Sequence, residues 1–292
     1  MAERANGIAT PTPDLEAMLT AMRPRLHRFA ARMTGSVIEG EDVVQETMLK
    51  ALEARPARPI ANPEAWVFRI ARNTALDLLR RRGRERPFDE DESEEIADPV
   101  MDTDRGYVAA AGLRMFMQLP PAQRACAILM DVIGYSLDEV GAILEMTVPA
   151  VKAALHRGRG RLKVATQRPD GSLPIVLPDA ERRQLETYIR HFNARDFDAI
   201  RALLADDVRV DVHSSQIHGK VASSRYFTRY DALSDWHLEP GIVDGQPVAL
   251  VRGANGEIGY FMAVDWRDDL IAVIRDYRGL AYLLEDAAPR VL

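Results

Sequence analysis

The segment SLDEVGAILEMTVPAVKAALHRGRGRL, residues 136–162, decides the fold of the first half of this chain, because its pattern predicts a helix–turn–helix. Ser136 followed by Glu139 is the capping-box pattern that starts a helix. Apolar residues then recur at intervals of three and four up to position 144. Residues 145–147 form the predicted turn, and Thr147 with Pro149 begins a second helix.

The second helix carries charge of one sign. Residues 149–168 contain six Lys or Arg and no Asp or Glu. The solvated face of an amphipathic helix normally mixes both signs. A basic helix that follows a capped helix and a short turn is typical of recognition in a DNA major groove. The pattern favours DNA binding over the alternative, a helical hairpin whose basic face is only solvated.

Composition limits the class of protein. A chain of 292 residues suggests two domains of roughly 100–200 residues each, and its 47% hydrophobic content is enough for packed cores. The net charge of −6 is an average, because residues 89–104 contain nine acidic residues and no basic one. The single cysteine, Cys126, excludes a disulfide framework and a CxxC zinc site. With no apolar run near the ~18–20 residues of a membrane span and no signal-peptide pattern, we expect a cytoplasmic protein that neither enters a membrane nor binds a metal.

Three further stretches give the chain a resemblance to a known family. DVVQETMLKAL (42–52) and PEAWVFRIARNTALDLLRRR (63–82) resemble region 2 of the extracytoplasmic-function (ECF) sigma factors. LPPAQRA (119–125), followed by the helix–turn–helix, resembles region 4 of the same family. The resemblance implies two all-α regions and a protein that binds core RNA polymerase, recognises promoter DNA and directs transcription initiation.

The resemblance also assigns roles to matched positions. For docking on the polymerase clamp it implies Asp42, Gln45 and Glu46. For the −10 element, beside the base-capturing loop 55–62, it implies Arg69, Asn73, Asp77, Arg80 and Arg81. For the −35 element it implies the basic helix, with Lys152, His156, Arg157, Arg159 and Arg161. A cationic surface suits melted DNA, and a basic helix can contact phosphates and base edges of a duplex.

One residue departs from the family pattern. Glu145 stands in the turn where the family often has Gly. The turn therefore needs a different conformation, or Met146 in a strained one.

The period of the sequence changes to two in the last third of the chain. After two helices within 180–204, alternating segments at 208–212, 236–239, 247–251, 258–264 and 270–274 predict strands. Breaks such as Asp244-Gly245 predict hairpins. LLADDVRVDV (203–212) resembles the SnoaL-like domains of the ketosteroid-isomerase-like superfamily. The predicted fold is an α+β cone with a curved antiparallel sheet.

The sequence thus predicts a multi-domain chain: a mobile tail 1–13, sigma region 2 at 14–86, an acidic linker 87–104, sigma region 4 at 105–166, a linker 167–178 and a SnoaL-like domain 179–286. Two flexible linkers would give the last domain a high effective concentration near the sigma regions, so we expect it to contact them and to modulate their activity. An anti-sigma factor is a further candidate partner.

Enzymatic chemistry in the last domain has a weaker basis. Its chemically able residues are Asp211, His213, His218, His237, Tyr260 and Asp265. Their spacing defines no catalytic dyad, so we expect no catalytic residue, no cofactor and no enzyme activity. Two alternatives to a sigma factor stay open: a helix–turn–helix regulator with a ligand-sensing tail, and a SnoaL-like enzyme fused to a DNA-binding module.

Overall fold

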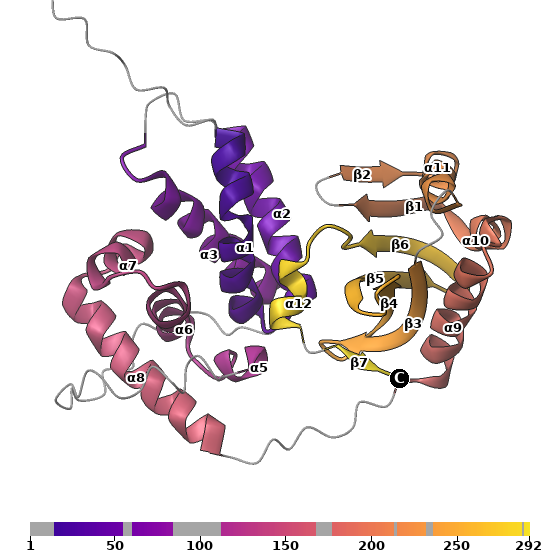
Figure 1. Ribbon diagram of the computed structural model, residues 1–292. Helices are drawn as coiled ribbons and strands as arrows, with labels where there is room; N and C mark the ends of the chain where they lie inside the picture. The colour runs from indigo at the N-terminus through magenta and orange to yellow at the C-terminus, as the bar shows by residue number, and fades with distance from the viewer. Residues whose placement is uncertain are drawn as a thin grey trace, which may run out of the picture. The chain divides into compact units, whose positions relative to one another are not determined.

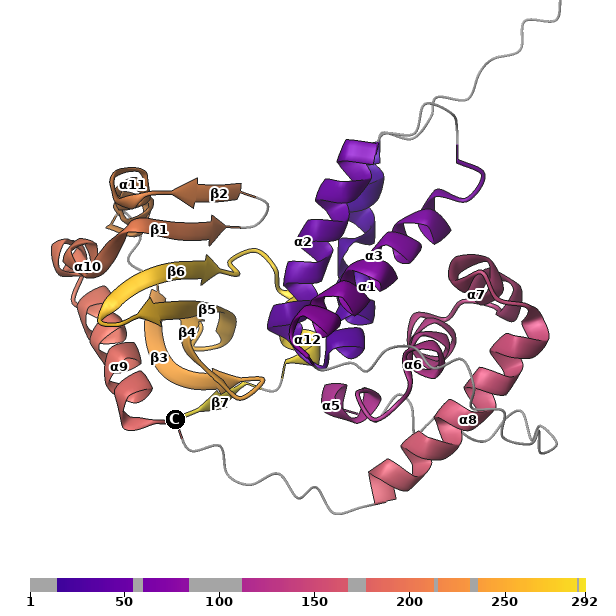
Figure 2. The ribbon, with the colours of Figure 1, turned by 180° about the vertical axis from the view of Figure 1, so that it is seen from behind.

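The computed structural model describes residues 15–54, 60–83, 112–167, 177–212, 215–231, 236–287 and 289–292. The chain divides into two compact units, Met1–Pro169 and Asp170–Leu292, which are described separately below (Figures 1 and 2). The predicted tail, the acidic linker and residues 168–176 of the second linker lie outside the described residues. None of the helices within the described ranges is long and apolar enough to cross a membrane.

The first unit begins with helices that pack against one another: α1 (Leu15–Thr34), α2 (Val37–Ala54) and α3 (Pro63–Arg81). The predicted start of α3 at Pro63 is confirmed. Asn62 caps this helix, its side-chain oxygen accepting a hydrogen bond from the Ala65 amide at 3.0 Å. Helices α1 and α2 approach closely at Gly40, where a Cβ atom would come within 2.7 Å of the Ala31 backbone.

The second half of this unit is also helical: α5 (Leu113–Phe116), α6 (Pro121–Ala127), the π-helical turn η1 (Ile128–Ile133), α7 (Leu137–Leu144) and α8 (Val148–Gln167). Helices α7 and α8 confirm the predicted helix–turn–helix. The Ser136 hydroxyl accepts from the Glu139 amide, and the Glu139 carboxylate accepts from the Ser136 amide at 2.8 Å. The Thr147 hydroxyl caps α8 by accepting from the Ala150 amide at 3.4 Å.

The turn between α7 and α8 has a single residue in the left-handed conformation. This residue is Glu145 itself, with φ 58° and ψ 40°, and not Met146. The turn closes on Gly141, whose carbonyl accepts from the amides of Glu145 and Met146. A Cβ atom on Gly141 would lie 2.8 Å from the Met146 carbonyl oxygen, so the close return of the chain requires glycine there.

The helices of the first unit share one hydrophobic core. It includes Leu26 of α1, Phe68 of α3, Leu129 of η1 and Leu155 of α8, all buried. Arg124 of α6 adds polar contacts, because its guanidinium donates to the carbonyls of Met33 and Leu119 at 2.7 and 2.9 Å. The two predicted sigma regions therefore pack as one body.

The second unit combines a sheet with covering helices. Its helices are α9 (Asp179–Asn193), α10 (Phe197–Leu203), α11 (Lys220–Asp231) and α12 (Tyr282–Asp286). Its strands are β1 (Leu204–Val212), β2 (Ser215–His218), β3 (Trp236–Val243), β4 (Gln246–Gly253), β5 (Ile258–Arg267), β6 (Leu270–Asp276) and β7 (Arg290–Val291). The strand order is β2-β1-β6-β5-β4-β3-β7.

The sheet differs from the predicted one in the pairing of one strand and in its two edge strands, because β2 and β7 were not predicted. The described hairpins are antiparallel, as expected, and the predicted turn at Asp244-Gly245 joins β3 to β4 with both residues at positive φ. Strands β1 and β6, however, pair in parallel, which makes the sheet mixed. Parallel pairing requires a long crossover, and α11 with β3–β5 supplies it.

Helix α9 lies across the sheet over β3 and β4 (Figure 2). The space between them is filled by an aromatic core that includes Tyr188, Phe192, Phe227 and Tyr230. The Phe192 ring is central to this core, because it meets the rings of Phe197, Tyr230 and Trp236 at centroid distances of 4.9–5.4 Å.

Candidate functional site

The basic helix α8 presents only part of its charge to solvent. Lys152 and His156 are exposed and Arg157 is half-buried. The capping box stabilises the start of α7, and the Thr147 cap stabilises the start of α8. The exposed side chains of α8 therefore extend from a helix with a defined beginning. Hydrogen bonds from Ser136 lower the pKa of the Glu139 carboxyl, which keeps the capping box charged at neutral pH.

The other two predicted −35 residues point toward the protein. Arg159 makes two hydrogen bonds to the Asp131 carboxylate of η1, at 3.0 and 2.5 Å, and the Asp131 side chain is fully buried. Arg161 donates to the Gln123 side chain of α6 at 3.2 Å. These contacts attach α8 to the preceding helices. The sequence showed that Arg159 is charged but not which way its side chain points. Its partner Asp131 is distant in sequence, and nothing in the sequence marked Asp131 as a partner.

The predicted polymerase-docking residues lie along one face of α2. Asp42, Gln45 and Glu46 are each half-buried. The same face includes Leu49, which sequence reasoning missed and whose side chain is 59% exposed. Leu49 follows Glu46 by three residues and Gln45 by four, and this spacing could have placed it on the same helix face. Together the four residues form a patch with an exposed apolar side chain beside polar and acidic ones.

The predicted −10 surface of α3 adjoins this patch. Glu46 of α2 pairs with Lys50 at 2.8 Å and with Arg81 of α3 at 3.5 Å. Further along α3, Asp77 pairs with Arg80 at 2.9 Å, and Asn73 is exposed. The remaining member of the set, Arg69, forms an ion pair with Glu145 in the turn after α7. Residues 55–59 of the predicted base-capturing loop lie outside the described residues.

The interior of the second unit holds a buried carboxylate that sequence reasoning did not single out. Asp276, at the end of β6, is 1% exposed. Its carboxylate accepts hydrogen bonds from the hydroxyls of Tyr226 and Tyr230 at 2.8 and 2.6 Å, and from the Arg278 amide at 3.0 Å. Burial, and then the nearby Asp276 charge, raise the pKa values of both tyrosines, so the phenols stay protonated as donors.

Of the predicted chemically able residues, only Tyr260 joins this group. Its hydroxyl lies 3.2 Å from that of Tyr230. Asp211 is nearly buried but pairs with Arg209, and Asp265 pairs with Arg275 at 2.7 Å. The side chains of His218 and His237 are exposed, and His213 lies outside the described residues.

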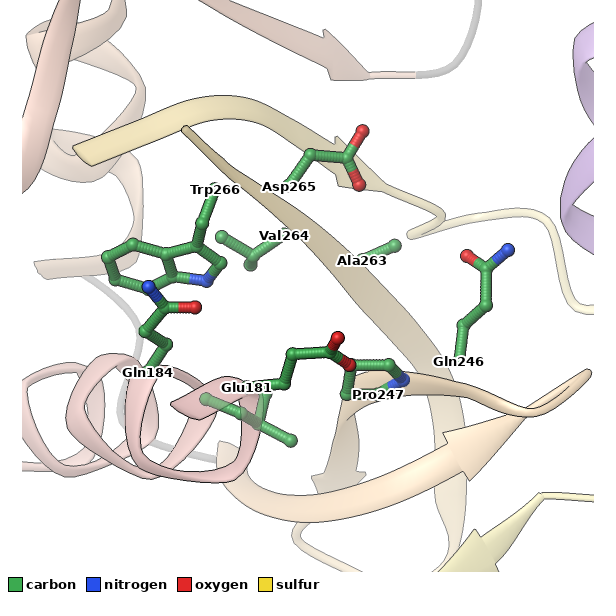
Figure 3. A pocket seen from close by; sticks show the side chains of 9 residues that line it. Glu181, Gln184, Gln246, Pro247, Ala263, Val264, Asp265 and Trp266 are labelled. Carbon is green, nitrogen blue, oxygen red and sulfur yellow. The ribbon is translucent and has the colours of Figure 1, made fainter. Parts of the chain in front are cut away.

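A separate pocket of about 340 Å³ opens between the start of α9 and strands β4 and β5 (Figure 3). Leu185, Pro247 and Val264 give it an apolar lining. Its polar and aromatic lining comes from Glu181, Gln184, Gln246, Asp265 and Trp266. The pocket does not include Asp276 or its tyrosines. Within the described residues no group of His, Cys, Asp and Glu is arranged to hold a metal ion.

Comparisons with known families match three parts of the chain. Residues 18–85 match Sigma-70 region 2, residues 113–162 match Sigma-70 region 4, and residues 185–269 match the SnoaL-like domain.

Proteins similar to this chain include the ECF RNA polymerase sigma factor SigG of Mycobacterium tuberculosis. It is 31% identical over 279 residues, a match that covers 84% of this chain and 75% of SigG. The ECF sigma factor SigE of Mycolicibacterium smegmatis is 31% identical over 164 residues, which cover 54% of this chain and 64% of SigE. The ECF sigma factor SigJ of M. tuberculosis is 27% identical over 263 residues, covering 83% of this chain and 79% of SigJ.

Proposed function

Because this chain belongs to the ECF RNA polymerase sigma factors, with a C-terminal SnoaL-like domain, we propose that α2, α3 and α8 divide the work of transcription initiation between them. The patch of Asp42, Gln45, Glu46 and Leu49 on α2 docks on core RNA polymerase. An exposed apolar side chain beside polar and acidic ones is the arrangement of a protein interface with an apolar centre and a polar rim.

Promoter DNA then meets two surfaces. The −10 element is bound by α3, through Arg69, Asn73, Asp77, Arg80 and Arg81. The −35 element is bound by α8, through Lys152, His156 and Arg157, while Arg159 and Arg161 hold the helix in place. The observation that carries the proposal is the capped helix–turn–helix, whose second helix is anchored on one side by Arg159 and exposes Lys152 and His156 on another.

For the C-terminal unit we propose regulation of the sigma regions and no catalysis. The Asp276 carboxylate already accepts three hydrogen bonds, two of them from the hydroxyls of the buried Tyr226 and Tyr230. A general base needs a lone pair that a substrate can reach, and this carboxylate is 1% exposed. An anti-sigma factor, which would cover the α2 or α8 surface, is a further partner that fits these charged faces.

Run-off transcription with purified core polymerase tests the proposal. We expect the full chain to initiate at a defined promoter, and a chain truncated after Arg168 to initiate with altered strength or promoter preference. Lack of initiation by both, with DNA binding intact, would favour a helix–turn–helix regulator. Identical transcription by the two chains would contradict a regulatory role for the C-terminal unit.

A further inference from the structure

The segment before α7 binds the beginning of helix α3. The Tyr135 hydroxyl donates to the Glu64 carboxylate at 2.9 Å, and the Tyr135 ring meets the Phe68 ring edge to face with centroids 5.5 Å apart. Arg25 of α1 completes the group. Its guanidinium pairs with Glu64 at 3.1 Å and lies 5.1 Å from the centre of the Tyr135 ring. The N-terminal end of α7 is thereby attached to the first turns of α3.

The turn after α7 binds the same helix further along. The Glu145 carboxylate forms an ion pair with Arg69, which among the described residues is the polar partner of its side chain. This glutamate sits at φ 58°, in the left-handed region that is strained for a residue with a Cβ and open to glycine. Glycine would suit the backbone of the turn better, but it would leave Arg69 without a counter-charge.

Arg69 is also the first residue of the proposed −10 surface. The other members, Asn73, Asp77, Arg80 and Arg81, are exposed on α3. The Arg69 Nη1 that contacts Glu145 cannot donate the same N–H to a DNA phosphate, and the Glu145 carboxylate repels a phosphate that approaches the rest of the guanidinium. Glu145 and single-stranded DNA are therefore competitors for Arg69.

We propose that α7, attached at its two ends by Tyr135 and Glu145, is an intramolecular latch on α3, and that single-stranded promoter DNA opens the latch by taking Arg69 from Glu145. The inference rests on the proposed DNA-facing role of α3. The ion pair is suited to displacement, because the Arg69 and Glu145 side chains are 36% and 66% exposed and water screens their attraction. Engagement of the −10 strand would then release the end of the helix–turn–helix from α3.

Binding of oligo(dT), a single-stranded probe without sequence information, tests the competition by fluorescence anisotropy. Glu145→Gln should bind about two- to five-fold more tightly than the unaltered chain, the range that loss of an exposed ion pair gives. Asp138→Asn is the matched control, because it removes the same charge from an exposed position of α7. In an Arg69→Ala background the effect of Glu145→Gln should disappear.

Hydrogen exchange of the amides of residues 137–146 tests the movement itself. Oligo(dT) should accelerate exchange in the unaltered chain and in Asp138→Asn, but not in Arg69→Ala. Tyr135→Phe, which removes only the hydroxyl that reaches Glu64, should accelerate exchange without DNA.

The outcomes separate the two proposals. If Glu145→Gln and Asp138→Asn bind oligo(dT) equally, or if the effect of Glu145→Gln persists without Arg69, the latch is wrong while the DNA-facing role of α3 stands. If no variant binds oligo(dT), the DNA-facing role of α3 fails and the latch with it.

Discussion

Two arginines of α8, Arg157 and Arg159, carry the same charge but lie in different environments. Arg157 is half-buried and belongs to the proposed −35 surface, whereas Arg159, two positions later, is held by a fully buried Asp131. Removing one partner of a buried ion pair leaves the other charge desolvated and unpaired, which costs far more than losing a surface pair. Substitution of Arg157 should therefore change promoter binding, whereas loss of the Arg159–Asp131 pair should change the free energy of unfolding.

Asp131→Asn should reduce the free energy of unfolding of the first unit by roughly 3–5 kcal/mol, because it removes the charge of the buried carboxylate that Arg159 contacts. Chemical denaturation measures the loss. Arg157→Ala is the control: it should weaken promoter binding and leave stability nearly unchanged. Equal stability of Asp131→Asn and the unaltered chain would mean that water replaces the carboxylate at this position.

At the scale of an element, the helix–turn–helix depends on its caps. The capping box satisfies amide groups at the start of α7 that have no partner within the helix. These contacts are local in sequence, which explains why the capping box, the Thr147 cap and the start of α3 at Pro63 could all be predicted. The left-handed conformation of Glu145 was harder to place, because the sequence signalled strain in the turn without saying which residue takes it.

Ser136→Ala should destabilise the first unit by about 1 kcal/mol at neutral pH, since it removes the hydroxyl from the capping box. The Glu139 carboxyl has a pKa below its ordinary 4.5, so its contribution is present above that pH and is lost as pH falls through the lower folded value. Thermal unfolding of the two chains should therefore differ less in acid than at neutral pH. A difference that grows in acid would contradict the role given to Glu139.

At the scale of the whole molecule, the described residues form two cores of different character. The first core is built from helices and is mainly aliphatic, while the second gathers rings around Phe192. The fold class of each unit could be predicted from the spacing of apolar residues. A period of 3.6 residues indicates a helix with one buried face, and a period of two indicates a strand with one buried face. The parallel pairing of β1 with β6 did not follow, since strand order depends on contacts between segments distant in sequence. Asp276 escaped prediction for the same reason: its partners Tyr226 and Tyr230 come from α11, a helix without a clear sequence signal.

We expect the full chain to unfold in two transitions, one for each core. Asp131→Asn should move only the transition of the first unit. Tyr230→Phe, which removes a hydrogen bond to the buried Asp276 carboxylate, should move only that of the second, by roughly 1.5–3 kcal/mol. Calorimetry of the three chains makes the comparison. A single transition shifted by both variants would show that the units unfold as one.

The strand order has a consequence for how copies of this protein behave when they are crowded. The two edges of the described sheet are its shortest strands, β2 with four residues and β7 with two. Long edge strands invite a neighbouring chain to add a strand of its own and begin aggregation. The two-residue β7 pairs with β3 at Gly241 and Ile242, and so covers that part of the β3 edge. Residues 290–291 therefore occupy the hydrogen-bonding edge of β3 at Gly241 and Ile242, where a strand of another copy would otherwise pair.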